Sequence, residues 1–310
     1  MSDVIVLNNG KFRAEIVPEI GGNLISLRHS ASGTKLLREP SDLRELAEFP
    51  ARFGLPVLFP PNRIQDGRFT FEGKEYFLPI NEKITNNHLH GLVWKKPWTL
   101  TAHGKDYAEL TFVFSPENPE YEGFPFAFTL KRVFTLTASG LSDRMTVINQ
   151  GRGDMPLGLG YHSTFPAESA KIRMGTGNDQ FEIGERFLPT GRRLEWGDID
   201  PRRWFDPQGV TIGFHSTAEP MRGDDGTVFH GAEILYESGL LRYITDEKFR
   251  FWYTWNNRGD GDFISLEPIS WMADALNRPE PPEMTGVRML APDSQSVFQC
   301  ELRFYPRSSR

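Results

Sequence analysis

Cysteine occurs once in the 310 residues of this chain, at position 300, which excludes an internal disulfide. The sequence has no Asn-x-Ser/Thr glycosylation site, and no apolar run approaches the roughly 20 residues that a membrane helix needs. Residues 1–4 lack the basic and then apolar pattern that begins a secretory signal. These absences predict a protein of the reducing cytoplasm with no membrane partner.

Positive charge is also in short supply. Lys and Arg number 35 against 41 Asp and Glu, which gives a formal net charge of −6 at pH 7. This balance argues against nucleic acid or an anionic membrane surface as the main partner.

Linkers and repeats are missing as well. Pro and Gly are spread along the chain, no low-complexity segment separates two halves, and no repeat of fixed period occurs. A length of 310 residues suits one large domain or two ordinary ones, and large all-β sandwiches absorb it as one unit. We therefore predict a single domain over residues 1–310, with 24 Phe supplying much of its core.

Apolar residues recur with period two, which is the pattern of half-buried antiparallel strands. It is clear at residues 110–114, 126–136, 141–149 and 298–304. Arg132 is the one polar interruption in the second of these, and Cys300 falls on the apolar face of the last, so we interpret Cys300 as core.

Helical patterns are scarce. Residues 41–45 begin like a capped turn with Ser41 as the N-cap, but Pro50 stops it early. Strands do not alternate with long amphipathic helices, which argues against Rossmann and α/β-barrel folds. Two stretches, 175–210 and 215–232, read as loop-rich because charged residues, Gly and Pro cluster there. The predicted fold is a large antiparallel all-β sandwich.

Three separated segments carry residues suited to acid/base chemistry. His90 lies in a turn before Gly91, His162 follows a Gly-rich segment, and Glu267 ends the apolar strand 263–266 just before Pro268. Burial would raise the pKa of a carboxyl in that position, which suits a general base near neutral pH. The alternatives are a structural ion pair of Glu267 with a nearby Arg and histidines that merely cap the core or lie on the surface.

Arginine and tryptophan side chains are further candidates for substrate binding. Arg63, in a Pro-rich segment, has a planar guanidinium that can bind a substrate oxygen, or it is an ordinary surface Arg. The Trp residues at positions 94, 98, 252, 255 and 271 could offer ring faces to sugar C–H groups, but we interpret most of them as core.

Motifs for other chemistries fail. Residues 158–160 form Gly-x-Gly, but Ser163 stands where a dinucleotide loop has its third Gly. The serine-hydrolase motif Gly-x-Ser-x-Gly is absent. His88 and His90 share a strand face, yet no further ligand stands at metal spacing, so no metal and no cofactor are predicted.

Read together, these segments resemble the aldose 1-epimerase (galactose mutarotase-like) family. The likeness rests on Asn62-Arg63-Ile64 with Gly67-Arg68-Phe69, on Leu89-His90-Gly91 with Trp98, on Gly123-Phe124-Pro125-Phe126, on residues 155–162 ending in Tyr161-His162, and on Leu266-Glu267-Pro268. All five occur in the family's order and span most of the chain. The resemblance implies a β-supersandwich, a small-molecule sugar as partner, and interconversion of its α and β anomers.

The resemblance also implies roles for single residues. Glu267 would be the base that takes the C1 hydroxyl proton, and His162 the acid that protonates the ring oxygen. His90 and Arg63 would hold sugar oxygens. An Asp near residues 223–229 would bind further hydroxyls; we choose Asp225, with Asp224 as the alternative, because the spacing departs from the family pattern.

The sugar itself is less well defined. Leu92 replaces the second Gly that galactose mutarotases carry after His90-Gly91, a change typical of the branch with hexose-6-phosphate epimerases, but Trp94 stands where that branch often has Arg. We expect an unphosphorylated aldohexose and a monomer or homodimer. The alternatives are a hexose-6-phosphate epimerase, with phosphate contacts from Lys95, Lys96 or Arg192-Arg193, and a non-catalytic sugar-binding or sugar-sensing protein on the same fold.

Overall fold

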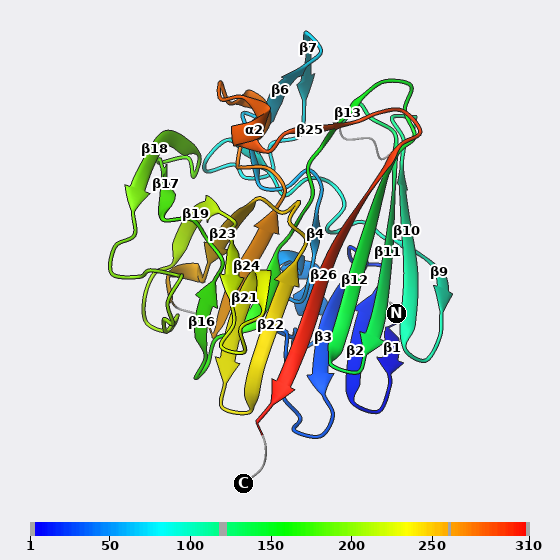
Figure 1. The fold of residues 1–310 in the computed structure, drawn as a ribbon. Helices are drawn as coiled ribbons and strands as arrows, with labels where there is room; N and C mark the ends of the chain where they lie inside the picture. Colours follow the sequence, from blue (N-terminus) through cyan, green and yellow to red (C-terminus); the bar gives the residue numbers. More distant parts are fainter. Residues whose placement is uncertain (1–3, 118–122, 260–261, 308–310) are drawn as a thin grey trace.

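A nine-stranded antiparallel sheet forms one face of the protein in a computed structural model that describes residues 4–117, 123–259 and 262–307. Figure 1 shows it running from β9 across to β21 and β22. Its strands, in spatial order, are β16 (Lys171–Met174), β21 (Val228–Tyr236), β22 (Gly239–Thr245), β26 (Gln295–Pro306), β12 (Gly140–Asn149), β11 (Phe128–Thr137), β10 (Tyr107–Phe114) and β9 (Thr99–His103), with β20 (Pro220–Arg222) beside β21.

An eight-stranded antiparallel sheet carries the predicted second histidine and the glutamate. Its strands, in spatial order, are β18 (Pro189–Glu195), β17 (Asp179–Ile183), β19 (Gly213–Thr217), β23 (Phe251–Trp255), β24 (Phe263–Ile269), β14 (Gly160–Tyr161) and β4 (Val57–Leu58), with β15 (Ser163–Pro166) also paired to β24. One face of this sheet packs on the nine-stranded sheet, where Ser163 Oγ lies 2.7 Å from the Tyr243 hydroxyl. The candidate site lies on its other face, beside a second, smaller hydrophobic cluster that includes Tyr253 and Ile269.

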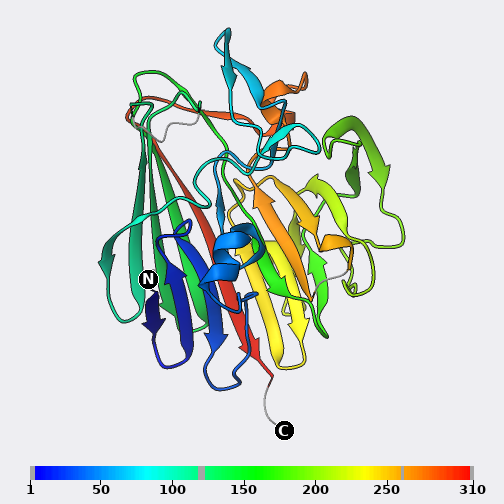
Figure 2. The same cartoon turned by 180° about the vertical axis from the view of Figure 1, so that it is seen from behind.

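Smaller sheets complete the architecture. The three-stranded sheet packs on the large sheet through contacts of β1 with β10 and of β2 with β11, and it lies in front of it in Figure 2. The strands are β1 (Ile5–Asn8), β2 (Phe12–Val17) and β3 (Asn23–His29), and the two-stranded pairs are β5 (Arg63–Gln65) with β8 (Asn87–Leu89), β6 (Arg68–Phe71) with β7 (Lys74–Phe77), and β13 (Met155–Leu157) with β25 (Arg288–Leu290). The expected antiparallel all-β sandwich is thus confirmed.

Helices are short throughout the described residues. They are α1 (Leu43–Glu48), α2 (Pro282–Thr285) and three 3-10 turns, η1 (Pro50–Arg52), η2 (Asn257–Gly259) and η3 (Ala275–Asn277). The predicted N-cap was wrong by one residue: the Asp42 carboxylate, not Ser41, accepts hydrogen bonds from the N–H groups of Arg44 and Glu45. No helix in the described part of the chain is long and apolar enough to span a bilayer.

The expectation of loop-rich stretches was right for most of residues 175–210, where the β17–β18 hairpin is the regular structure, and wrong for 215–232, which contains most of β19, β20 and the start of β21. The expectation that Pro268 ends a strand was also wrong. Pro268 does not end its strand, because β24 continues to Ile269. Pro268 is tolerated inside the sheet because it falls between the residues of β24 that pair with β15 and the one that pairs with β14.

The hydrophobic core lies between the sheets and draws on both ends of the described chain, from Leu7 to Phe304. Cys300 is 2% exposed within it, as expected. Arg132, the polar interruption, is fully buried and forms a bidentate ion pair with Asp143, while its remaining N–H groups donate to the carbonyls of Gly22 and Leu55. Every charge in this cluster therefore has a partner, as burial requires.

Candidate active site

The site begins with one row of side chains that crosses the eight-stranded sheet. His215 on β19 pairs with Tyr253 on β23, and Tyr253 pairs with Glu267 on β24. Ser163 pairs with Leu266 and Gly160 with Ile269, so the same register sets His162 opposite Glu267. Directly opposed residues of antiparallel strands point to the same face, and this row lies on the face away from the nine-stranded sheet.

His162 lies at a break in the strand ladder. The chain pairs with β24 on both sides of it, through β14 and β15, while its own N–H donates to the Pro56 carbonyl at 3.0 Å. This break leaves the imidazole beside the glutamate, with Nε2 3.2 Å from Glu267 Oε1. Burial lowers the pKa of His162 to about 4.

Glu267 is an almost completely buried carboxyl, with 1% of the residue exposed. Its Oε1 also accepts a hydrogen bond of 2.7 Å from the Ser265 hydroxyl, two residues earlier on the same strand face, and its Oε2 has no hydrogen-bond partner. Burial raises the pKa of Glu267 to about 8, against the opposing effects of Ser265 and of the Arg63 charge. No arginine pairs with Glu267 among the described residues, so the ion-pair alternative for this carboxyl was wrong.

His90 faces His162 from a separate segment. Its ring centroid lies 5.2 Å from that of His162 and the two planes are nearly perpendicular, at 88°. The backbone turns sharply there, as expected, with φ of 66° at His90 and 72° at Gly91. A Cβ on Gly91 would lie 2.1 Å from the Phe59 carbonyl oxygen, so only glycine lets the two segments pack this closely. Burial holds the pKa of His90 well below its usual value.

Arg63 comes to the site on β5, the partner strand of β8. Its guanidinium forms a bidentate ion pair with Glu82, with Nε 2.9 Å from Oε2 and Nη2 2.7 Å from Oε1. Thr85 and Asn87 donate further hydrogen bonds to Glu82. The Arg63 side chain is 12% exposed, so it is not the surface arginine of the alternative interpretation. The partner carboxylate, Glu82, was not identified from the sequence.

A loop after β24 holds Arg63 in place. The Asp274 N–H donates to the Arg63 carbonyl at 2.8 Å, and the Asp274 carboxylate accepts from the Gln65 N–H at 2.9 Å. His215 supports this loop because its Nε2 accepts from the Ala273 N–H at 3.3 Å while Nδ1 donates to the Trp252 carbonyl at 2.8 Å. His215, at the end of the row, thus helps to fix the position of Arg63 through the backbone of residues 273 and 274.

Asp225 lies elsewhere. It follows β20 in the turn before β21, and its carboxylate forms a bidentate pair with Arg242 at 2.8 and 2.9 Å. These hydrogen bonds hold the pKa of Asp225 well below its usual value. Neither a hydrogen bond nor an ion pair joins Asp225 to His90, His162, Glu267 or Arg63 in the described structure. The alternative, Asp224, is also occupied, by Arg173.

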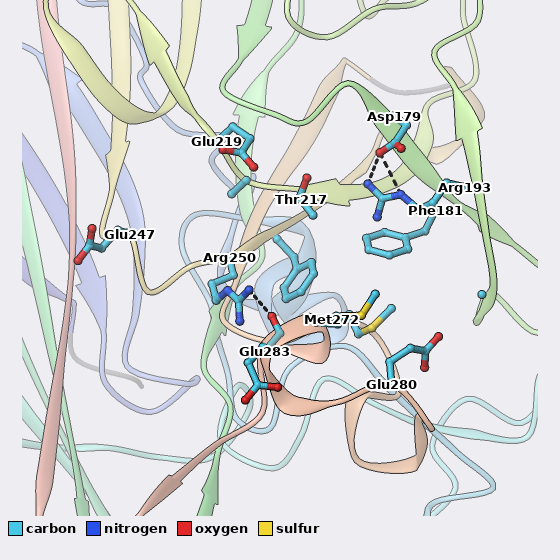
Figure 3. A pocket seen from close by; sticks show the side chains of 14 residues that line it. Asp179, Phe181, Arg193, Thr217, Glu219, Glu247, Arg250, Met272, Glu280 and Glu283 are labelled. Carbon is cyan, nitrogen blue, oxygen red and sulfur yellow. Dashed lines mark hydrogen bonds and ion pairs between the residues drawn. The ribbon is translucent and has the colours of Figure 1, made fainter.

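A pocket of about 480 Å³ lies on the same sheet, beside the stem of the β17–β18 hairpin. Figure 3 shows Phe181 and Met272 around it and the Arg193 guanidinium turned to Asp179. Phe251 also lines this pocket. None of the five predicted site residues lines it. Within the described residues, no group of three or more His, Cys, Asp or Glu side chains is arranged to hold a metal ion.

Comparison with known proteins identifies the family. The family model described as aldose 1-epimerase matches residues 3–236. The chain belongs to the aldose 1-epimerase family. The matched stretch contains Arg63, His90 and His162 and ends before Glu267, so the position of Glu267 in the site rests on the register of β24 described above.

Relatives within the aldose 1-epimerase family and its fold cover most of the chain. A galactose mutarotase-like protein from Clostridium acetobutylicum superposes with a TM-score of 0.92 at 26% identity, over 99% of this chain and 96% of its own. Galactose 1-epimerase from Lactobacillus acidophilus has the same fold, with a TM-score of 0.75 at 14% identity over 98% and 95% of the two chains. The uncharacterized Escherichia coli protein YphB is 25% identical over 78% of this chain and 80% of its own length.

This aldose 1-epimerase family member can hold one shared proton in its site. Values of about 8 for Glu267 and about 4 for His162 mean that, at neutral pH, the pair carries a single proton across the 3.2 Å contact. Such a pair can accept a proton at one atom while donating one at the other. Ser265 and Tyr253 were not predicted, although Ser265, two residues before Glu267, follows from strand alternation.

Proposed function

We propose that the protein is an aldose 1-epimerase that interconverts the α and β anomers of an unphosphorylated aldohexose. The observation that carries the proposal is the Glu267–His162 pair, two opposed side chains that share one proton on the sheet face turned away from the nine-stranded sheet. Mutarotation needs a base and an acid at neighbouring oxygens of the sugar, O1 and O5. The family to which the chain belongs supports the same reaction.

The proposed reaction moves two protons and breaks one bond. In the reactive form the shared proton has moved from Glu267 to His162 across their 3.2 Å contact. The Glu267 carboxylate then takes the proton from the C1 hydroxyl, and the O–H electron pair forms the C1=O1 double bond. The C1–O5 bond breaks, and O5 takes the proton of the His162 imidazolium. Rotation about C1–C2 and closure with the roles reversed give the other anomer, and the pair returns to its starting state.

Side chains that hold the sugar in place next to Glu267 and His162 supply the rest of the proposed rate enhancement. General acid/base catalysis contributes about 10²- to 10⁴-fold. We assign sugar oxygens to His90, which is half-buried beside His162, and to Arg63, as the family resemblance implies. Trp255, half-buried with its ring centroid 6.1 Å from that of His162, adds an apolar wall.

The charge around Arg63 favours a free sugar over a hexose 6-phosphate. Arg63 is already neutralised by Glu82. Arg192 is paired with Glu182, and Arg193 is paired with Asp179. A phosphate dianion would have to displace a bound carboxylate from each of these cations, which costs the free energy of the existing ion pair.

Polarimetry of freshly dissolved α-D-glucose and α-D-galactose tests the proposal, with Glu267→Gln as the paired variant. We expect the wild-type protein to speed the approach to the unchanged anomeric equilibrium, and the variant to lose this activity while it still binds sugar. If the protein accelerates the mutarotation of hexose 6-phosphates but not of free sugars, its substrate is a phosphorylated sugar and not the unphosphorylated aldohexose proposed here. Sugar binding without acceleration of any sugar would support the non-catalytic alternative instead.

Location and assembly remain proposals. A cytoplasmic monomer or homodimer is consistent with the single, buried Cys300 thiol, which needs no oxidising compartment. Sedimentation equilibrium of the purified chain distinguishes the two oligomeric states.

A further inference from the structure

The turn that joins β17 and β18 places an exposed phenylalanine next to Arg63. Phe187 lies in this turn, which is closed by hydrogen bonds from Gly184 N–H to the Leu188 carbonyl and from Phe187 N–H to the Gly184 carbonyl, both 2.9 Å. The Phe187 ring centroid is 4.9 Å from Arg63 Cζ, and the side chain remains 47% exposed. One side of the ring thus covers the guanidinium while much of its surface faces solvent.

This arrangement carries two costs. Phe187 has φ of 58°, in the left-handed region that bulky side chains avoid, and it leaves a large apolar surface in water. Strain of about 1–3 kcal/mol at such positions tends to mark functional sites. His90, in the candidate active site, has the same left-handed backbone, with φ of 66°.

The turn is also fixed firmly to the site. Arg186 donates to the carbonyls of Thr85 and Asn86 at 2.8 Å each, and its own carbonyl accepts from Asn87 Nδ2 at 3.0 Å. Asn87 in turn donates to Glu82, the partner of Arg63. The position of the Phe187 ring is therefore set by the same segment that leads to His90.

Tyr253 lies on the inner side of the guanidinium, with its ring centroid 5.8 Å from Arg63 Cζ, and it is the strand neighbour of Glu267. Phe187 and Tyr253 accordingly mark the outer and inner limits of the site at Arg63. A pyranose has an apolar C–H face, and flat aromatic rings offer a rigid surface to such groups at small entropic cost.

We propose that Phe187 is a specificity residue whose exposed ring forms the outer wall of the sugar site and packs against the C–H face of the bound pyranose beside Arg63. The inference rests on the proposed function. It assigns Phe187 to substrate binding and not to proton transfer, so its effect belongs in KM.

Steady-state mutarotation kinetics of Phe187→Ala, Phe187→Gly and Phe187→Tyr test this role with α-D-glucose and α-D-galactose. We expect Phe187→Ala to raise KM about tenfold while kcat changes less than threefold. Phe187→Tyr, which keeps an aromatic ring, should have the KM of the wild type. Phe187→Gly relieves the backbone strain, so it should match Phe187→Ala in KM while melting at the same or a higher temperature. The tyrosine and glycine variants keep the test informative if the alanine variant folds poorly.

Phe49→Ala is the matched control, because Phe49 is 38% exposed and lies 4.6 Å from the guanidinium of Arg52 in the same kind of contact. Its KM should equal that of the wild type. An unchanged KM in Phe187→Ala, or a loss confined to kcat, would overturn the assignment of Phe187 while leaving the epimerase proposal intact. A wild-type protein that accelerates no sugar would instead overturn the proposed function itself.

Discussion

Ser265 offers a way to test the acid/base pair without removing either member. Its hydroxyl donates a 2.7 Å hydrogen bond to Glu267 Oε1 in a fully buried environment and stabilises the ionised carboxylate. A hydrogen bond to a charged group contributes about 1.5–3 kcal/mol, and a change of one in pKa corresponds to about 1.4 kcal/mol. Ser265→Ala should therefore move the pKa of Glu267 above its value of about 8 by about one pH unit or more.

The pH dependence of kcat/KM shows this change directly. In the wild type the Glu267–His162 pair holds its single proton between about pH 4 and about pH 8. Activity should fall below about pH 4, where both groups are protonated and no base remains, and above about pH 8, where neither group has a proton to donate. In Ser265→Ala the alkaline limb should move upward by about one pH unit, and the plateau should fall about tenfold because the carboxylate form is less populated. The acid limb, set by His162, should stay in place.

Ser163→Ala is the control for this experiment. Ser163 is equally buried and makes a contact of the same length, 2.7 Å to the Tyr243 hydroxyl, on the opposite face of the sheet. It should lower the melting temperature without moving either limb. An alkaline limb that stays at its wild-type pH in a well-folded Ser265→Ala protein would refute the assignment of that limb to Glu267.

Three further predictions follow from the same geometry. His162→Asn should lower kcat by about 10²- to 10⁴-fold in polarimetry, whereas His90→Asn should mainly raise KM; the reverse pattern would exchange their roles. Glu82→Gln should make inorganic phosphate a competitive inhibitor by freeing the Arg63 charge, and equal inhibition of the wild type would count against a neutralised Arg63. Arg132→Met should lower the free energy of unfolding by about 3–5 kcal/mol in urea titrations because Asp143 is left buried and unpaired, and adding Asp143→Leu should recover most of it; no recovery would contradict this explanation.

The fold followed from the sequence because period-two alternation over long strands has few other solutions. The runs that predicted strands at 110–114 and 298–304 lie within β10 and β26. The β17–β18 hairpin was missed because all its strand residues except the buried Pro189 are half-exposed or exposed, so no apolar alternation marks it. Pro268 misled for a different reason: a gap in the ladder beside β24 removes the usual need for a backbone N–H at this position, which proline lacks.

For the site, sequence reasoning found residues whose chemistry is visible locally and missed those defined by contact. Glu267 was recognisable as a carboxyl ending a buried strand, and the structure brings it together with His162, His90 and Arg63. Glu82 was not recognisable, because nothing near it in the sequence marks it as the partner of Arg63. Asp225 shows the opposite case: a family pattern pointed to it, while its contacts tie it to Arg242. Its assignment to sugar binding stays a prediction.

The hydrogen bond from the Gln65 N–H to the Asp274 carboxylate joins residues 209 positions apart. Contacts of such sequence separation form late in folding, because a long loop must close before they can contribute. During synthesis, the segment with Arg63 and His90 emerges long before β24. Its polar side chains therefore lack their native partners until β24 and the loop after it have been synthesised. Activity should therefore appear only after the local β10–β11 and β11–β12 pairs of the nine-stranded sheet acquire protection from hydrogen exchange.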